Sequence, residues 1–222
     1  MPDPSGPPGS VGILVPTGML GGGFSPETIA RGLRLGADVI AVDGGSTDSG
    51  PYHLGAGVAK TADQAVRRDL RLLLAAASSA RIPLIVGSCG TSGTDSGVNW
   101  VADLVHAICA EDGLDLTVAK IFSEQHAGPL IADLERGRVH ALPPSGPLDA
   151  ATLRRCAHIV AMMGHEPIEQ ALRAGADVVL AGRATDTAVS AAFALMRGMP
   201  PGPTWHAAKI IECGGQCTTN PA

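Results

Sequence analysis

Two similar segments limit what this chain can fold into more than any other feature of its sequence. ETIARGLRLGADVIAVDGGSTD begins at Glu27, and EPIEQALRAGADVVLAGRATD begins at Glu166 (166 − 27 = 139), with one residue fewer before the final Thr-Asp. Each copy predicts a helix, a Gly-Ala-Asp turn, an apolar strand and a polar loop. Ordinary helix–strand packing explains the Gly-Ala-Asp part equally well, but it requires no shared Thr-Asp beyond the strand. The chain therefore contains an internal βα repeat.

The rest of the chain alternates short apolar runs with longer segments of helical periodicity. This alternation is typical of βαβ units with right-handed crossovers, and the low aromatic content of 3% favours an aliphatic core under a buried parallel sheet. We predict an α/β fold with a mostly parallel sheet of six or seven strands flanked by helices. The candidate strands are residues 11–18, 38–43, 82–88, 116–123, 158–163, 176–182 and 207–215.

Capping signals mark where two of the helices begin. Ser25 followed by Pro26 predicts an N-cap and a proline in the first turn, and Thr61 with Gln64 predicts a capping box. Further along, Val98, Val101, Val105 and Ile108 fall on one face of a predicted helix, which we expect to pack on the sheet.

Composition and charge exclude several classes of protein. The 222 residues predict a disordered tail over 1–10 and a single α/β domain over 11–222. A net charge of −5 without a basic stripe argues against nucleic-acid binding, and no apolar run is long enough for a membrane span. Five cysteines, an odd number, do not form a disulfide framework and favour a reducing, cytoplasmic location.

The loops that follow the predicted strands carry most of the chemically useful side chains. Ligands of parallel α/β sheets bind beyond the carboxyl ends of the strands, so these loops predict the functional edge. Acids gather there, and they require protonation, a divalent cation such as Mg or Mn, or hydroxyl and arginine partners. Cys213 and Cys217 form only an isolated, weak zinc motif. The predicted catalytic residues are Asp43, Asp48, His165, Asp186 and Glu212.

A glycine- and hydroxyl-rich loop at residues 87–97 precedes one predicted helix. Backbone N–H groups and hydroxyls at such a helix start suit a carboxylate or phosphate, although a flexible loop of good turn formers has the same composition. Cys89 is either a nucleophile near a helix start or a small apolar filler. The residues predicted to bind substrate are Ser46, Thr47, Ser88, Cys89, Gly90, Thr91, Ser92, Thr94, Asp95, Glu124, Arg183 and Thr185.

Arg183 is the only arginine or lysine in these loops. A guanidinium there would hold a substrate carboxylate through two hydrogen bonds, or would instead form a salt bridge with Asp186 or Asp48. His165, at the start of a predicted helix, is a candidate general acid or base near neutral pH.

Four motifs resemble the N-terminal part of the AtuA-type acyclic terpene utilisation proteins. They are VDGGSTDSGPYHLG, GSCGTSGTDSG, AGRATDTA and IIECGGQCTTN, and the similarity runs from about Val11 to the end. The resemblance implies catabolism of carboxylate or acyl compounds by a lyase, hydratase or hydrolase step. It also implies that this chain is the N-terminal portion of a longer protein.

These features together predict an enzyme acting on a small carboxylate or acyl-CoA. The alternative is a non-catalytic ligand-binding subunit that needs a partner chain or a missing C-terminal part. We expect a small anionic substrate and a homo-oligomer or partner subunit.

Overall fold

A parallel β-sheet forms the centre of the molecule. The computed structural model describes residues 9–45 and 51–214. Within them the sheet has five strands in the order β1-β2-β3-β5-β4. All neighbouring strands run parallel, which confirms the predicted α/β class, but the predicted six or seven strands are too many. The strands are β1 (Ile13–Leu14), β2 (Val39–Asp43), β3 (Leu84–Gly87), β4 (Val118–Ile121) and β5 (Val178–Ala181).

Two of the predicted strands are absent from the sheet. Residues 158–163 make only isolated bridges, Val160 with Glu124 and Met163 with Ala184, and Met162 stays largely exposed. A short apolar run does not distinguish a strand from an extended connection. Residues 207–211 belong to helix α9 (Pro201–Ile211), whose Thr204 and Ala208 are buried one turn apart. The proline at its start and this spacing of four residues favour the helix.

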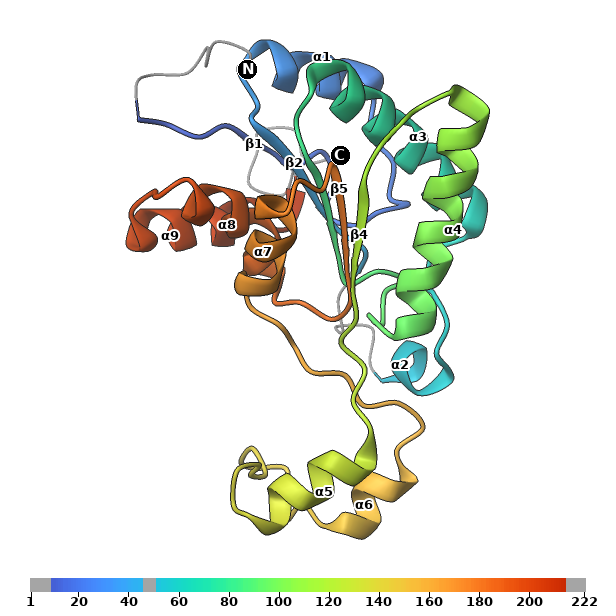
Figure 1. Ribbon diagram of the computed structural model, residues 1–222, viewed down its shortest axis with the longest axis vertical. Coiled ribbons are helices and arrows are strands. Elements are labelled where there is room, and N and C mark those ends of the chain that lie inside the picture. Colours follow the sequence, from blue (N-terminus) through green and yellow to red (C-terminus); the bar gives the residue numbers. More distant parts are fainter. Residues whose placement is uncertain (1–8, 46–50, 215–222) are drawn as a thin grey trace.

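Helices cover both faces of the sheet (Figure 1). The first layer contains α1 (Pro26–Arg34), α3 (Asp63–Ala80) and α4 (Asp95–Asp112), and the second contains α7 (Glu166–Arg173) and α8 (Asp186–Met196), with α9 packed on α8. Successive side chains of a strand point to opposite faces, so Ile40 and Val42 of β2 enter the first core while Val39 and Ala41 enter the second. Each strand of the centre is therefore buried on both sides.

The helix starts follow the capping signals in one case and not in the other. The Ser25 hydroxyl accepts a hydrogen bond from the Thr28 N–H at 3.3 Å, which confirms the predicted N-cap of α1. The predicted capping box at Thr61 is wrong, because the N-cap of α3 is the next residue, Ala62, which provides no side-chain cap, and the helix begins at Asp63. In α4, the predicted apolar face is confirmed, since all four of its members are buried: Val98, Val101, Val105 and Ile108.

The sequence repeat corresponds to a structural repeat. The Asp38 carboxylate accepts the Gly12 N–H at 2.7 Å at the start of β1, and the Asp177 carboxylate accepts the Thr117 N–H at 2.8 Å at the start of β4. Exchanging β1 with β4 and β2 with β5 gives the same strand order read from the opposite edge of the sheet, and the helices α1 and α7 then exchange faces. The two copies thus occupy topologically equivalent places on either side of β3.

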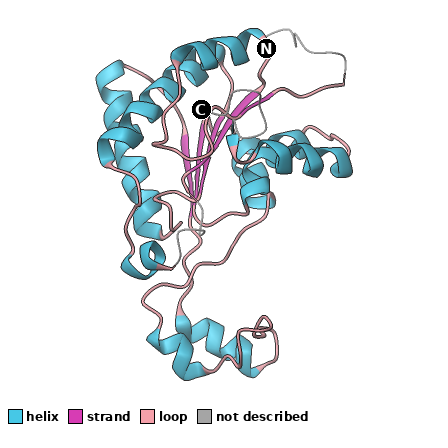
Figure 2. Cartoon of the chain, turned by 180° about the vertical axis from the view of Figure 1, so that it is seen from behind, coloured by secondary structure: helices cyan, strands magenta, loops and turns pink. Residues whose placement is uncertain are grey.

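Two short segments lie beyond the carboxyl ends of the strands. Helices α5 (Ala127–Glu135) and α6 (Ala150–Arg155) pack on each other and project away from the sheet (Figures 1 and 2). Helix α2 (Tyr52–Ala56) belongs to the connection between β2 and α3. None of the helices in the described part of the chain has the length and hydropathy of a membrane span.

Candidate functional site

The sheet has a topological switch point between β3 and β5. The chain leaves β3 toward α4 on one face, and it leaves the neighbouring β5 toward α8 on the other face. Adjacent loops that diverge in this way leave a crevice at the carboxyl ends of the strands, where α/β proteins bind ligands. The loops after β2, β3 and β5 meet at this place.

Arg183 lies at the switch point, and it is 4% exposed. Its Nη1 donates to the Thr91 carbonyl at 3.2 Å, and its Nη2 donates to the Gly45 carbonyl at 3.1 Å and to the Ser88 hydroxyl. Nε donates to the carbonyl of Ala184 at 3.3 Å. Asp186 is 3.7 Å away, so the predicted salt bridge exists at long range. Most N–H groups of the guanidinium therefore already donate hydrogen bonds to acceptors within the protein.

Asp43, the last residue of β2, lies beside this arginine and is 7% exposed. Its carboxylate accepts the Gly45 N–H at 3.0 Å. Burial raises the pKa of Asp43 to about 7, and the charge of Asp186 adds to this, while the bonds from Gly45 and Ser88 and the charge of Arg183 oppose it. The Ser88 hydroxyl accepts a hydrogen bond from Nη2 of Arg183 and also helps to lower the pKa of Asp43, so it lies near both side chains.

The loop after β3 supports this group through an unusual backbone. Ser88 and Thr91 have φ values of 45° and 68°, a region that non-glycine residues rarely occupy. A Cβ atom on Gly93, whose φ is 70°, would lie 2.2 Å from the Arg183 backbone nitrogen. Such conformations persist where the surrounding structure imposes them, and they cluster at functional sites.

Most polar groups predicted to bind an anion from this loop are used internally. Ser92 and Thr94 are buried, their hydroxyls lie 3.2 Å apart, and Thr94 caps α4 by accepting the Gly97 N–H at 3.2 Å. The Thr91 hydroxyl accepts the Lys60 N–H at 3.1 Å. Gly90, with φ of 67°, packs its Cα against Gly97. The loop acts as a packed support for Ser88 and Arg183.

Cys89 lies in the first core, fully buried. Burial, together with the charge of Asp43, raises the pKa of the Cys89 thiol far above its ordinary value. A buried thiol of this kind is a poor nucleophile, so the structure favours the filler role over the nucleophile.

Glu124 and Asp95 form a second group, at the end of β4. The Glu124 carboxylate accepts the Asp95 N–H at 3.0 Å, and Asp95 in return accepts the Glu124 N–H at 3.2 Å. His158 Nδ1 lies 2.5 Å from Oε1 of Glu124. Sequence reasoning missed His158 because it assigned residues 158–163 to a strand. Only the antiparallel bridge between Val160 and Glu124 brings this histidine to the edge.

Two further predicted acids reach the edge by different routes. Asp186 begins α8, next to Thr185, its N-cap. Glu212 follows α9 and not a strand, yet its charge and that of Asp186 both act on Lys209 and Cys213. Lys209 Nζ lies 2.6 Å from Oε1 of Glu212, which is 8% exposed. Helix α9 therefore returns Glu212 to the carboxyl edge.

His165 has partners other than the acids at the switch point. Its Nδ1 is 2.7 Å from Glu169, its Nε2 is 3.7 Å from Glu166, and its ring packs on Trp205. Four residues named in the sequence analysis lie outside the described part of the chain: Ser46, Thr47, Asp48 and Cys217.

A comparison with protein-family models identifies relatives of this chain. The model described as "Acyclic terpene utilisation family protein AtuA" matches residues 58–220. The chain belongs to the AtuA family. The match begins later than the expected Val11, so it includes Ser88 and Arg183 but not Asp43. No curated protein and no solved structure matches the chain.

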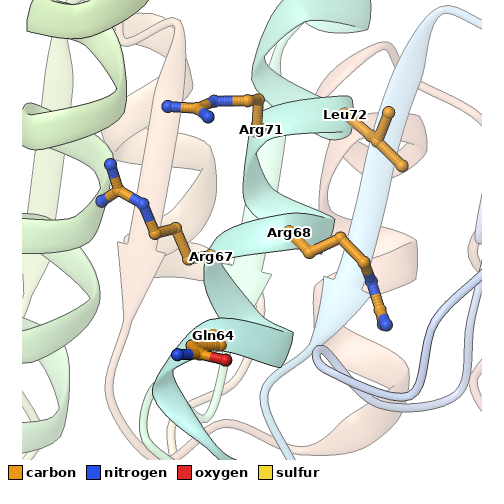
Figure 3. A pocket seen from close by; sticks show the side chains of 5 residues that line it. All are labelled: Gln64, Arg67, Arg68, Arg71 and Leu72. Atoms are coloured by element: carbon orange, nitrogen blue, oxygen red, sulfur yellow. The ribbon is translucent and has the colours of Figure 1, made fainter.

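A pocket lies on the outside of α3 in this AtuA-family chain (Figure 3). Its lining residues do not form a buried charged group comparable with Asp43 and Arg183. That pocket, of about 370 Å³, is lined by Gln64, Arg67, Arg68, Arg71 and Leu72. Its arginines are already paired: Arg67 with Glu111, Arg71 with Asp112 and Arg68 with Asp69.

A divalent metal was predicted as one partner for the clustered acids. Within residues 9–45 and 51–214, no three His, Cys, Asp or Glu side chains are arranged to hold a metal ion. In this part of the chain, Asp43 has a raised pKa because it is buried, and its carboxyl group accepts the Gly45 N–H.

Proposed function

We propose that this AtuA-family chain is a catabolic enzyme that acts on a carboxylate or acyl thioester through proton transfer, as lyases and hydratases do. One observation carries the proposal: a buried carboxyl group, Asp43, has a pKa of about 7 and lies beside the buried Arg183 at the switch point of the sheet. The family's description, acyclic terpene utilisation, supports a catabolic role.

A carboxyl group with this pKa exchanges its proton readily at neutral pH. General acids and bases work best when their pKa is near the working pH, and burial is the usual means of raising the pKa of a carboxyl group to that range. Arg183 is then a positioning residue that holds the loops after β2 and β3 and places a positive charge near the reacting group.

Nucleophilic hydrolysis is the less suitable class of reaction. The Cys89 thiol is buried with a raised pKa, and the described hydrogen-bond partner of the Ser88 hydroxyl is Arg183, not a histidine. Serine and cysteine nucleophiles require an adjacent base or a lowered pKa. Proton transfer by Asp43 requires neither.

Deuterium exchange tests this proposal. The full chain in D₂O is incubated with branched carboxylates and their acyl thioesters, and deuterium next to the carbonyl is measured by mass spectrometry. We expect incorporation by the wild-type protein and a loss of at least ~100-fold in Asp43→Asn, with ligand affinity retained. Asp103→Asn, on the exposed face of α4, is the matched control. Binding without exchange by the wild-type protein would instead indicate the non-catalytic ligand-binding subunit.

A further inference from the structure

The projecting arm, residues 122–163, consists of helices α5 and α6 and the two extended segments at their base. In the described part of the chain the two helices pack on each other, and no other helix or strand makes an extensive contact with them. Only Ile131 in α5 and Leu153 in α6 are buried. Helices of nine and six residues are marginal in water without tertiary packing. The arm therefore needs a further surface to pack on.

The base of the arm presents an exposed apolar patch. Its two segments run antiparallel, since the Ala161 N–H donates to the Ser123 carbonyl at 2.8 Å, and this register places Phe122 opposite Met162. Opposite residues of an antiparallel pair share a face. Phe122 is 47% and Met162 66% exposed. These two side chains form what we call the base patch.

The loop between the two helices, residues 136–149, carries a further exposed apolar side chain. Leu142 is 80% exposed, more than any other large apolar side chain in the described residues. Seven such side chains are exposed there, and three of them, Leu142, Phe122 and Met162, belong to the arm. Single exposed apolar side chains are normal, but their concentration on one projecting element is typical of an interaction site.

The helical part of the arm and the carboxyl edge of the sheet differ in charge. Residues 126–157 contain four arginines and three acids (4 − 3 = +1), which leaves −5 − 1 = −6 for the rest of the chain. All four arginines are exposed: Arg136, Arg138, Arg154 and Arg155. At the carboxyl edge, where α7 and α8 begin, the side chains of Glu166 and Asp186 are 68% and 41% exposed. The arm of one molecule and the edge of another are therefore complementary in charge.

The direction of the arm determines how a second copy can meet it. The arm projects beyond the carboxyl ends of the strands (Figures 1 and 2). Two copies whose carboxyl edges face each other bring each arm over the edge and the base patch of the other. A symmetric contact of this kind provides a packing surface for both arms and closes after two copies, so it requires no further protein.

We propose that two copies of this chain form a symmetric dimer in which Leu142 of each arm packs on Phe122 and Met162 of the other copy. Arg136, at the end of α5, then lies over the acidic edge of that copy. All three exposed apolar side chains of the arm become buried in one interface. The inference does not rest on the proposed function, because none of these residues takes part in proton transfer by Asp43.

Sedimentation velocity of the full chain over a range of concentrations tests the dimer. We expect a species with twice the chain mass of 22.4 kDa in the wild-type protein. Leu142→Asp should raise the dissociation constant of the dimer at least ~100-fold, because a symmetric interface loses two buried leucines at once. Leu35→Asp, at the C-cap of α1 and 72% exposed, is the matched control and should leave that constant unchanged.

A mixture of two variants tests the contact itself. Met162→Lys should also prevent the dimer, because the interface would then bury two unpaired ammonium groups. When Leu142→Asp and Met162→Lys are mixed, a mixed dimer pairs the new carboxylate with the new ammonium at one contact and keeps the native contact at the other. We expect the mixture to form dimers although each variant alone is monomeric.

Hydrogen exchange gives an independent readout of the arm. The amides of α5 and α6 should exchange slowly in the wild-type dimer and at least ~10-fold faster in Leu142→Asp, because the arm loses its packing surface. A wild-type chain that is monomeric at every concentration overturns the proposal, as does a dimer that Leu142→Asp and Leu35→Asp weaken equally. Failure of the mixed variants to associate overturns the contact between Leu142 and the base patch. Deuterium exchange through Asp43 is unaffected by any of these results.

Discussion

The side chain of Arg183 donates from Nη2 to the backbone carbonyl of Gly45, 3.1 Å away and 138 residues earlier in the chain. Through this bond the loop after β5 holds the loop after β2 across the intervening strand β3. The same guanidinium bonds to Ser88 and Thr91 of the β3 loop. One side chain thus ties together the three loops that surround Asp43.

Arg183→Lys should destabilise the fold. A single ammonium cannot replace a planar fork that serves several acceptors, and buried carbonyl groups such as those of Gly45 and Thr91 would lose their donors. We expect a loss of about 3 kcal/mol in the free energy of unfolding, measured by urea denaturation. Arg31→Lys, on the exposed face of α1, should change it by less than ~0.5 kcal/mol. Equal effects of the two substitutions would show that the buried contacts of Arg183 contribute little.

Asp43 should make the stability fall as the pH rises. Its pKa is about 7 in the folded protein against an ordinary 3.8, so the folded state binds this proton more tightly than the unfolded chain does. The stabilising contribution is complete below the unfolded pKa and is lost as the pH rises through about 7. Between about pH 5 and pH 8 the free energy of unfolding of the wild-type protein should therefore fall by up to about 3 kcal/mol more than that of Asp43→Asn. Denaturation of both proteins across that range measures it, and parallel curves would contradict it.

Gly93 and Gly113 provide a matched pair of substitutions. Both have left-handed backbones, with φ of 70° and 66°, but a Cβ on Gly93 would meet the Arg183 nitrogen at 2.2 Å, whereas a Cβ on Gly113 meets nothing within 4 Å. Gly113→Ala should cost about 1 kcal/mol, the conformational penalty alone. Gly93→Ala should cost more than ~3 kcal/mol, because the backbone at the switch point must move. Similar midpoints of thermal unfolding would refute the close packing of these loops.

Cys89 should resist alkylation while the protein is folded. Burial and the charge of Asp43 raise the pKa of its thiol, whereas Cys156 is exposed in the projecting α5–α6 segment. Iodoacetamide followed by peptide mapping should find Cys156 modified and Cys89 unmodified until denaturant is added. Modification of both at similar rates in the native protein would restore Cys89 as a candidate nucleophile.

Local patterns in the sequence determined the α/β class and most of its helices. Continuous aliphatic runs predicted β2, β3 and β5 because strands buried on both faces need apolar side chains on both. The repeat predicted two equivalent βα units, and the bonds of Asp38 and Asp177 at equivalent strand starts confirm them. The Ser25 cap followed from residues within one turn of each other.

Features that depend on distant partners were decided by the tertiary structure. Residues 207–211 are helical because α9 packs on α8, and residues 158–163 are an extended connection because β4 and β5 already pair with each other. The hydrogen-bond partners of Arg183 come from loops about 90 and 140 residues away, as the separations of 92 and 138 residues show. His158 meets Glu124 across 34 residues. A side chain's chemical type is written in the sequence, but its burial, its pKa and its partners arise only when separate segments meet at one edge of the sheet.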